Sequence, residues 1–200
     1  MTGFSITGIR AVLPRIAEAA EAAADELNAA DGKLGDGDLG VTVSQGWRQL
    51  ADAAPDLPED LGQCFMRCAQ LFQKASSSSF GTLTATAFMA TARATNGRTE
   101  VPWSEVPKLL GNALEAMMHR GQARLGDKTV LDAIDAVQRA LDALSDPERM
   151  AVAAREACDA ALKDFREKPN RTGRARMFAE QSIGLPDPGM LALCRILGAL

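Results

Sequence analysis

The sequence predicts an all-α fold of eight antiparallel helices without a sheet. Three observations support this prediction. Apolar residues recur with the spacing of an α-helix along nearly the whole chain, no segment alternates apolar and polar residues for long enough to require a strand, and short segments rich in glycine, proline and serine separate the apolar stripes. The chain has 200 residues, 46% of them hydrophobic, which is enough for one compact domain, 1–200, with a sizeable core.

The expected helices are defined by their apolar stripes. In chain order the stripes fall within residues 9–23, 40–53, 61–72, 81–94, 103–117, 130–144, 152–165 and 188–199. The stripe at 103–117 is the clearest, and it follows a helix start at Pro102. The connections are expected at 31–40, 54–59, 74–82, 95–102, 120–128, 145–147 and 167–189. The last is the longest, and loops of that length inside a compact domain are usually functional or disordered.

Charge and hydropathy exclude several classes of function. The net charge is −4, and the longest basic run is only "NRTGRAR", residues 170–176, so we expect no nucleic acid partner. No segment approaches the roughly 20 uninterrupted apolar residues of a membrane span. The N-terminus "MTGFSITGIR" lacks the pattern of a signal peptide. We therefore expect a cytoplasmic protein without a membrane partner.

The four cysteines are expected to be reduced core residues. Cys64 and Cys68 lie four residues apart on an expected helix, whereas Cys158 and Cys194 are isolated. A thiolate metal site needs further ligands at short spacing, and the single histidine, His119, is far from them in sequence. His119 ends an expected helix, where a cation suits the helix dipole.

The most unusual segment is "DGKLGDGDLGVT", residues 31–42. Three aspartates and four glycines fall within its first ten residues, although like charges repel and ordered glycine costs backbone entropy. Asp31, Asp36 and Asp38 can converge on one or two hard cations such as Mg²⁺. An EF-hand does not fit, because Trp47 stands where the bidentate glutamate belongs. The alternative is a solvated acidic turn that caps the helix near Gly40.

Three further connections resemble anion-binding loops. "KASSSSFGTLTAT", residues 74–86, leads into a helix and offers hydroxyl and backbone N–H groups, although a serine-rich cap or linker is an alternative. "RGQARLGDKTVLDAI", residues 120–134, approaches a Walker A motif, but Asp127 interrupts it and a helix precedes it. There, Thr129 and Asp132 predict a helix cap.

In "GRARMFAEQSIGLPDPGM", residues 173–190, arginines could meet phosphate, or the segment is only a turn before a helix that starts at Pro188. Alternate loops of an antiparallel bundle gather at one end. Acidic metal ligands would then lie beside helix N-termini that bind phosphate, which predicts a metal–nucleotide site.

The segments "GDGDLG", "RGQARLGDKTVLDA" and "SIGLPDPG", in this order and at similar separations, resemble the L subunit of dihydroxyacetone kinases (DhaL) over nearly the whole chain. This subunit is the nucleotide-binding half of a two-component kinase. The resemblance implies an eight-helix antiparallel barrel that binds Mg²⁺ and ADP or ATP at one end.

The resemblance also implies the site residues. Two Mg²⁺ ions would be held by Asp31, Asp36 and Asp38. The positions that match nucleotide contacts are Leu39, Gly40, Val41, Thr42, Ser78, Ser79, Phe80, Gly121, Val130, Arg174, Asp187, Pro188 and Gly189. Leu39 and Leu185 stand where the family often has histidine, and serines with Phe80 replace a glycine-rich loop.

The implied activity is that of a phosphotransferase that needs a partner. In the family the ketose is held covalently by a histidine of a separate K subunit, and no general acid or base is evident in this chain. The phosphoryl donor would be exchanging ATP, or bound ADP rephosphorylated by a phosphotransferase-system protein. Alternatives are an Mg–ADP-bound regulatory module that acts on a transcription factor, the nucleotide domain of a fatty-acid-kinase-like system, and a purely structural bundle.

Overall fold

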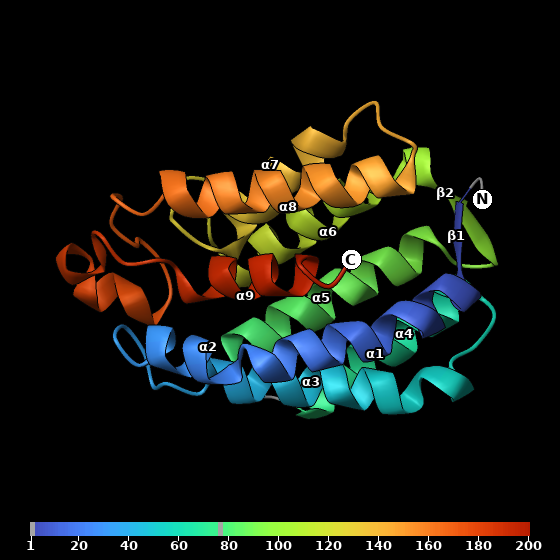
Figure 1. The fold of residues 1–200 in the computed structure, drawn as a ribbon, viewed down its shortest axis with the longest axis horizontal. Coiled ribbons are helices and arrows are strands. Elements are labelled where there is room, and N and C mark those ends of the chain that lie inside the picture. Colours follow the sequence, from blue (N-terminus) through green and yellow to red (C-terminus); the bar gives the residue numbers. More distant parts are fainter. Residues whose placement is uncertain (1–2, 76–77) are drawn as a thin grey trace.

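The computed structural model describes residues 3–75 and 78–200, apart from the side chains of residues 174 and 175, and it is predominantly helical (Figure 1). The α-helices are α1 (Ile6–Ala22), α2 (Ala24–Asp31), α3 (Leu39–Ala53), α4 (Leu61–Ala75), α5 (Ser79–Ala94), α6 (Val106–Gly121), α7 (Val130–Leu141), α8 (Pro147–Asp164) and α9 (Pro188–Leu197). Short 3₁₀-helices are η1 (Ala54–Asp56), η2 (Trp103–Glu105), η3 (Arg174–Phe178) and η4 (Glu180–Ser182). No helix of the described residues has the length and apolar character needed to cross a membrane.

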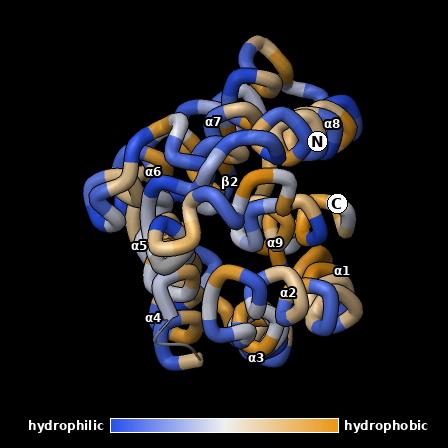
Figure 2. The backbone as a smooth tube through the Cα atoms, turned by 90° about the vertical axis from the view of Figure 1, so that its left-hand side faces the viewer, coloured by the Kyte–Doolittle hydropathy of each residue, from blue (hydrophilic) through white to orange (hydrophobic). Residues whose placement is uncertain are grey.

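The α-helices form a closed ring. Each of α3 to α8 packs against the next along the chain, α9 packs against α8 and α1, and α1 packs against α3. Figure 2, viewed along the helices, shows this ring end-on. The all-α prediction is therefore confirmed.

The expected first helix is divided at Ala23. The break gives nine α-helices in the described chain instead of the expected eight. Helical hydrogen bonds nevertheless continue through it, from Ala23 N to Ala19 O and from Leu27 N to Ala23 O. Helices α1 and α2 together thus take the place of one expected helix, and the other seven correspond one to one.

The expectation of no sheet is wrong in one detail. Strand β1 (Gly3–Ser5) pairs antiparallel with β2 (Glu100–Pro102), with Phe4 opposite Val101. Three residues are too few for apolar and polar positions to alternate recognisably, so the pattern that predicts strands is absent. The pair lies at the end of the molecule opposite the α2–α3 connection (Figure 1).

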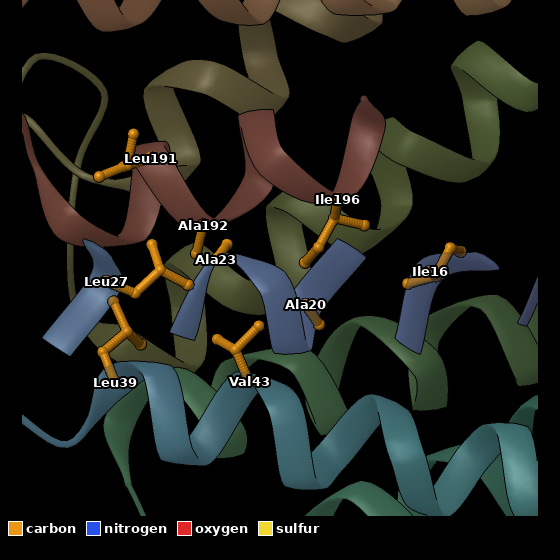
Figure 3. Close-up of a cluster of buried hydrophobic side chains, with 9 residues drawn as sticks. All are labelled: Ile16, Ala20, Ala23, Leu27, Leu39, Val43, Leu191, Ala192 and Ile196. Atoms are coloured by element: carbon orange, nitrogen blue, oxygen red, sulfur yellow. The ribbon is translucent and has the colours of Figure 1, made fainter. Parts of the chain in front are cut away.

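A buried apolar cluster joins α9 to the N-terminal helices. Figure 3 shows α1 and α2 between α3 and α9. The cluster consists of Ile16, Ala20, Ala23, Leu27, Leu39, Val43, Leu191, Ala192 and Ile196. Its alanines let the helix backbones approach closely, and this packing fixes the start of α9 relative to the α2–α3 connection. The ring also encloses an apolar cavity of about 340 Å³, bordered at one end by Phe80, Leu83 and Val130.

The prediction of four reduced cysteines is half correct. Cys64 and Cys68 are free and buried, but Cys158 of α8 and Cys194 of α9 form a disulfide. Their Cα atoms lie 5.6 Å apart across the α8–α9 interface, a separation that suits a disulfide. The sequence does not reveal this pairing because 36 residues separate the two cysteines and only the ring topology makes their helices neighbours.

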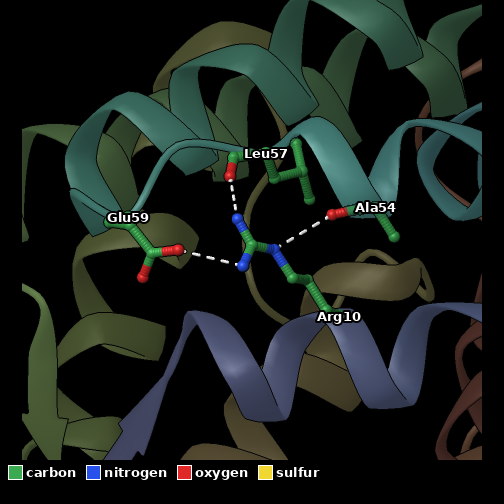
Figure 4. Close-up of polar contacts among 4 residues, drawn as sticks. All are labelled: Arg10, Ala54, Leu57 and Glu59. Carbon is green, nitrogen blue, oxygen red and sulfur yellow. Dashed lines mark hydrogen bonds and ion pairs between the residues drawn. The ribbon is translucent and has the colours of Figure 1, made fainter.

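Arg10 ties α1 to the connection between α3 and α4 (Figure 4). Its guanidinium donates to Ala54 O at 3.2 Å and Leu57 O at 2.6 Å, and it pairs with Glu59 at 2.9 Å. Arg10→Met is expected to lower the free energy of unfolding by about 1–3 kcal/mol, since two carbonyls lose a charged donor. Urea unfolding measures this, with exposed Arg149→Met as the control. Equal losses in the two variants would contradict the assignment.

Candidate functional site

Three carboxylates converge in the connection between α2 and α3. Asp31 ends α2, Asp38 immediately precedes α3, and Asp36 lies between them. One oxygen from each of the three carboxylates lies within 4.8 Å of the other two. Asp31 Oδ2 accepts hydrogen bonds from Gly37 N at 2.9 Å and Asp38 N at 3.2 Å, and Gly37 has a φ of +76°. Glycine is favoured there because this left-handed turn brings Asp36 and Asp38 back towards Asp31.

This acidic loop, residues 31–38, fits a hard divalent cation. Like charges this close repel, and a cation between them reverses the sign of the interaction. Carboxylate oxygens are the ligands that Mg²⁺ prefers, and Mg²⁺ leaves coordination positions for water or phosphate. Asp31 is half-buried while Asp36 and Asp38 are exposed, and all three residues line the adjacent cavity.

That cavity, the loop-end cavity, has a volume of about 620 Å³. Its lining includes the first residues of α3, α5, α7 and α9, so it lies at the end of the ring where these helices begin. The predicted site residues that line it are Asp31, Asp36, Asp38, Leu39, Val41, Thr42, Ser78, Ser79, Phe80, Val130, Asp187, Pro188 and Gly189. Residues far apart in the sequence are thus brought together as the loop-gathering argument expects.

Three predicted contacts do not belong to this lining. Gly40 faces α2, where its N–H donates to Asn28 Oδ1 at 2.7 Å. Gly121 ends α6, and a Cβ at this position would lie 3.3 Å from Leu83. Arg174 begins η3, but its side chain lies outside the described residues.

The start of α5 offers an anion-binding helix terminus. Ser78 caps the helix, and its Oγ accepts a hydrogen bond from Gly81 N at 3.0 Å. Ser79 and Phe80 form the first turn and line the cavity, while Ser76 and Ser77 of the same loop lie outside the described residues. Unpaired N–H groups and the dipole at such a terminus favour phosphate. The acidic loop and a helix N-terminus of a kind that suits anions therefore border the same cavity.

The starts of α7 and α9 form another part of the cavity lining. The predicted Thr129–Asp132 cap is confirmed, with Thr129 N donating to Asp132 Oδ2 at 2.8 Å. Asp187 caps α9 by accepting from Met190 N at 2.9 Å, and Pro188 is the first helical residue as expected. A Cβ on Gly189 would lie 3.3 Å from Asp187 Oδ1 and 3.4 Å from Val130 Cβ, so the start of α9 lies directly against the start of α7.

A buried polar network behind this part of the lining was not predicted. Asn170 Nδ2 donates to Lys128 O at 2.7 Å and to Asp187 Oδ2 at 2.9 Å, and Asn170 N donates to Ser182 Oγ at 2.8 Å. Asn170 also lines the cavity, as do Gln45 and Thr172, which sequence reasoning missed as well. Gln45 carries a weak sequence signal, because it lies one helical turn after Val41.

The network perturbs two ionisable groups. Burial raises the pKa of Asp187 to about 6, although hydrogen bonds from Met190 and Asn170 and the charge of Lys128 act in the opposite direction. Burial also lowers the pKa of Lys128, and the Asp187 carboxylate opposes this shift. The network thus contains a carboxyl that titrates closer to neutrality than an exposed aspartate.

Asp187→Asn is expected to change how stability depends on pH. The pKa of about 6 in the folded protein exceeds the ordinary value of 3.8, so the folded protein binds this proton more tightly than the unfolded chain. The resulting stabilisation is complete below the ordinary pKa and is lost as the pH rises through 6. Between about pH 7 and pH 5, the wild type should therefore gain stability relative to the variant. Urea unfolding at both pH values measures this, and parallel pH profiles would contradict the assignment.

Comparisons with known proteins agree with this architecture. The DAK2 domain matches residues 33–200. The chain is 32% identical over 183 residues to the L-erythrulose kinase of Pectobacterium atrosepticum, covering 88% of this chain and 31% of that protein. It is 30% identical over 172 residues to the ADP-binding subunit DhaL of PEP-dependent dihydroxyacetone kinase 2 from Listeria innocua, covering 82% of this chain and 79% of that protein.

A solved structure shows the same fold. The crystal structure of the dihydroxyacetone kinase from C. freundii in complex with AMP-PNP and Mg²⁺ superimposes with a TM-score of 0.76 at 24% identity, covering 100% of this chain and 34% of that one. The chain thus spans about a third of that kinase and of the erythrulose kinase, but about four fifths of the separate DhaL subunit. From the extent of these matches, the chain belongs to the DAK2 domain family.

Proposed function

We propose that residues 1–200 form one DhaL-like nucleotide-binding domain that binds Mg²⁺ with ADP or ATP and serves a kinase of dihydroxyacetone or a related short ketose. The observation that carries this proposal is the three-carboxylate cluster, which borders the same cavity as the start of α5. The relatives support the substrate class, since their names include L-erythrulose kinase and the ADP-binding subunit of a dihydroxyacetone kinase.

The chain's residues divide into three groups in this proposal. Asp31, Asp36 and Asp38 hold two Mg²⁺ ions, which supply charge neutralisation at the phosphate oxygens during phosphoryl transfer. Phosphates are held by backbone N–H groups at the starts of α3 and α5, together with Arg174. The nucleoside lies against the wall of Val130 and Asp187–Gly189, and Gly121 at the end of α6 lies beside Leu83, which also lines the cavity.

The phosphoryl acceptor is expected to come from another polypeptide. Among the described residues that line the cavity, the ionisable side chains are four aspartates, Asp31, Asp36, Asp38 and Asp187. The single histidine, His119, does not line it. Three of these aspartates are the proposed metal ligands, and the carboxylate of Asp187 is already engaged by Met190 N and Asn170 Nδ2, so we assign no lining side chain the role of a general base on a hydroxyl group. A K subunit that holds the ketose covalently would supply the activated acceptor, and the donor is exchanging ATP or a phosphotransferase-system protein that rephosphorylates bound ADP.

The test starts from protein stripped with EDTA. Melting temperatures are measured with no ligand, with Mg²⁺, with ADP, and with both. A ligand at one hundred times its dissociation constant stabilises the folded protein by about 2.7 kcal/mol, which raises the melting temperature by roughly 5–10 °C in a chain of this size. The full rise is expected only when Mg²⁺ and ADP are present together.

The second step adds a substrate. Phosphorylation of dihydroxyacetone by Mg²⁺ and ATP is measured with the chain alone, with a purified K subunit alone, and with both. Turnover is expected only in the mixture. No joint effect of Mg²⁺ and ADP on melting would refute nucleotide binding, whereas ketose phosphorylation by the chain alone would refute the dependence on a partner.

A further inference from the structure

Lys128 is an unusual lysine because it is completely buried. It lies in the α6–α7 connection, and its ammonium donates to three backbone carbonyls: Arg166 O at 3.0 Å, Lys168 O at 2.7 Å and Ser182 O at 2.8 Å. An ammonium has three donors, and all three are used. All three acceptors belong to one segment, residues 166–184.

The 166–184 segment has little apolar packing of its own. Its regular structure is limited to η3 and η4, and its large apolar side chains Met177, Phe178 and Ile183 are 72%, 38% and 46% exposed. A segment of this kind depends on polar contacts for its conformation. Internally it is closed by Gly184 N donating to Arg166 O at 2.9 Å and by Arg166 Nε donating to Gly184 O at 2.8 Å.

The contacts from this segment to the α6–α7 connection centre on Lys128. Besides the ammonium, Lys128 O accepts from Asn170 Nδ2 at 2.7 Å, and neighbouring Asp127 O accepts from Arg171 N at 2.9 Å. One residue thus binds the segment through both its side chain and its backbone. Lys128 adopts a φ of +61°, a left-handed conformation that non-glycine residues seldom adopt.

The same segment forms part of the loop-end cavity. Asn170, Thr172 and Gly173 line it, whereas Lys128 does not. We propose that Lys128 is a positioning residue for nucleotide binding, which acts by holding the backbone at 166, 168 and 182 so that residues 170–173 form the cavity wall. This inference rests on the proposed function, because it assumes that a nucleotide occupies the cavity.

These contacts fit a positioning role better than a role in overall stability alone. Burying an ammonium opposes folding unless its donors are satisfied, and a buried charge often adds little net stability relative to an apolar side chain. Three directional hydrogen bonds do, however, specify where the acceptors lie. Removing the ammonium would therefore loosen the segment more than the helical ring, which is held by apolar packing.

The experiment uses the full chain and measures ADP affinity by calorimetry at saturating Mg²⁺, well below the melting temperature. Lys128→Ala is expected to weaken ADP binding roughly tenfold, because misplacement of a wall by a fraction of an ångström is costly in a preorganised site. Lys163→Ala removes an exposed lysine of α8 and should leave ADP affinity unchanged.

Rescue of the Lys128→Ala variant by a small amine distinguishes a positioning role of Lys128 from a role in general stability. Lys128→Ala leaves space beside three carbonyls, so n-propylammonium, which carries three N–H donors, is expected to restore ADP affinity several-fold. Tetramethylammonium carries the same charge without donors and should not. If Lys128→Ala does not fold, Lys128→Gln, which keeps two donors, is measured in its place and is expected to bind ADP more weakly than the wild type.

The outcomes are distinct. A wild-type chain without Mg²⁺-dependent ADP binding would refute the proposed function, and this inference with it. Normal binding by the wild type and unchanged ADP affinity in the folded variant would refute the inference alone. Weakened binding without rescue by n-propylammonium would mean that Lys128 acts through general stability, and it would also overturn the inference.

Discussion

Asp36→Asn is expected to abolish the joint stabilisation by Mg²⁺ and ADP while leaving the ligand-free protein close to its original stability. The carboxylate is exposed in the acidic loop, and one of its oxygens lies within 4.8 Å of those of Asp31 and Asp38. Asparagine keeps the shape but removes one negative charge and one strong ligand for a hard cation. The rise in melting temperature of roughly 5–10 °C expected for the wild type at saturation should therefore disappear.

The matched control is Asp52→Asn, which removes an exposed carboxylate at the other end of α3. This control should retain the full joint effect, since residue 52 does not line the loop-end cavity. Calorimetric titration of ADP at fixed Mg²⁺ gives the same comparison as an affinity. If Asp36→Asn retained the effect of Mg²⁺ and ADP, the loop would be the solvated helix-capping turn that its sequence also allows.

Features that depend on local pattern were predictable from the sequence. Helix periodicity is local, so each apolar stripe identified a helix regardless of its neighbours. The acidic loop was also accessible, because its three aspartates fall within eight residues. The cap at Thr129 and the helix start at Pro188 follow from residues at most three positions apart, and the structure confirms both.

Features that depend on which segments meet were not predictable. The Cys158–Cys194 disulfide requires α8 and α9 to be neighbours. The position of Lys128 is a sharper example. In sequence it stands where a phosphate-binding lysine would follow a glycine-rich loop, yet its ammonium points to carbonyls 38 to 54 residues away. No local pattern distinguishes a buried anchoring lysine from an exposed one, because the acceptors are backbone groups that every residue type possesses.

Gly40→Ala is expected to be strongly destabilising. A Cβ at residue 40 would lie 2.0 Å from Ala24 O and 2.8 Å from Asn28 Oδ1. The nearest of these atoms belongs to the backbone of α2 and cannot rotate away, so the added methyl group must push the start of α3 away from α2. The loss of unfolding free energy is expected to be about 3 kcal/mol, which lowers the melting temperature by roughly 6–12 °C.

The matched control, Gly8→Ala, should have the opposite sign. Gly8 is exposed in α1, and a Cβ there would have no atom of the described residues within 4 Å. Alanine stabilises a helix by about 0.5–1 kcal/mol relative to glycine. Thermal melts of both variants test the pair, and ADP titration of Gly40→Ala extends the test to function. The acidic loop connects the end of α2 to the start of α3. Displacement of α3 should therefore also separate Asp31 from Asp38 and weaken the binding of Mg²⁺ with ADP. Equal stability of the two variants would show that α2 and α3 do not approach as closely as the structure places them.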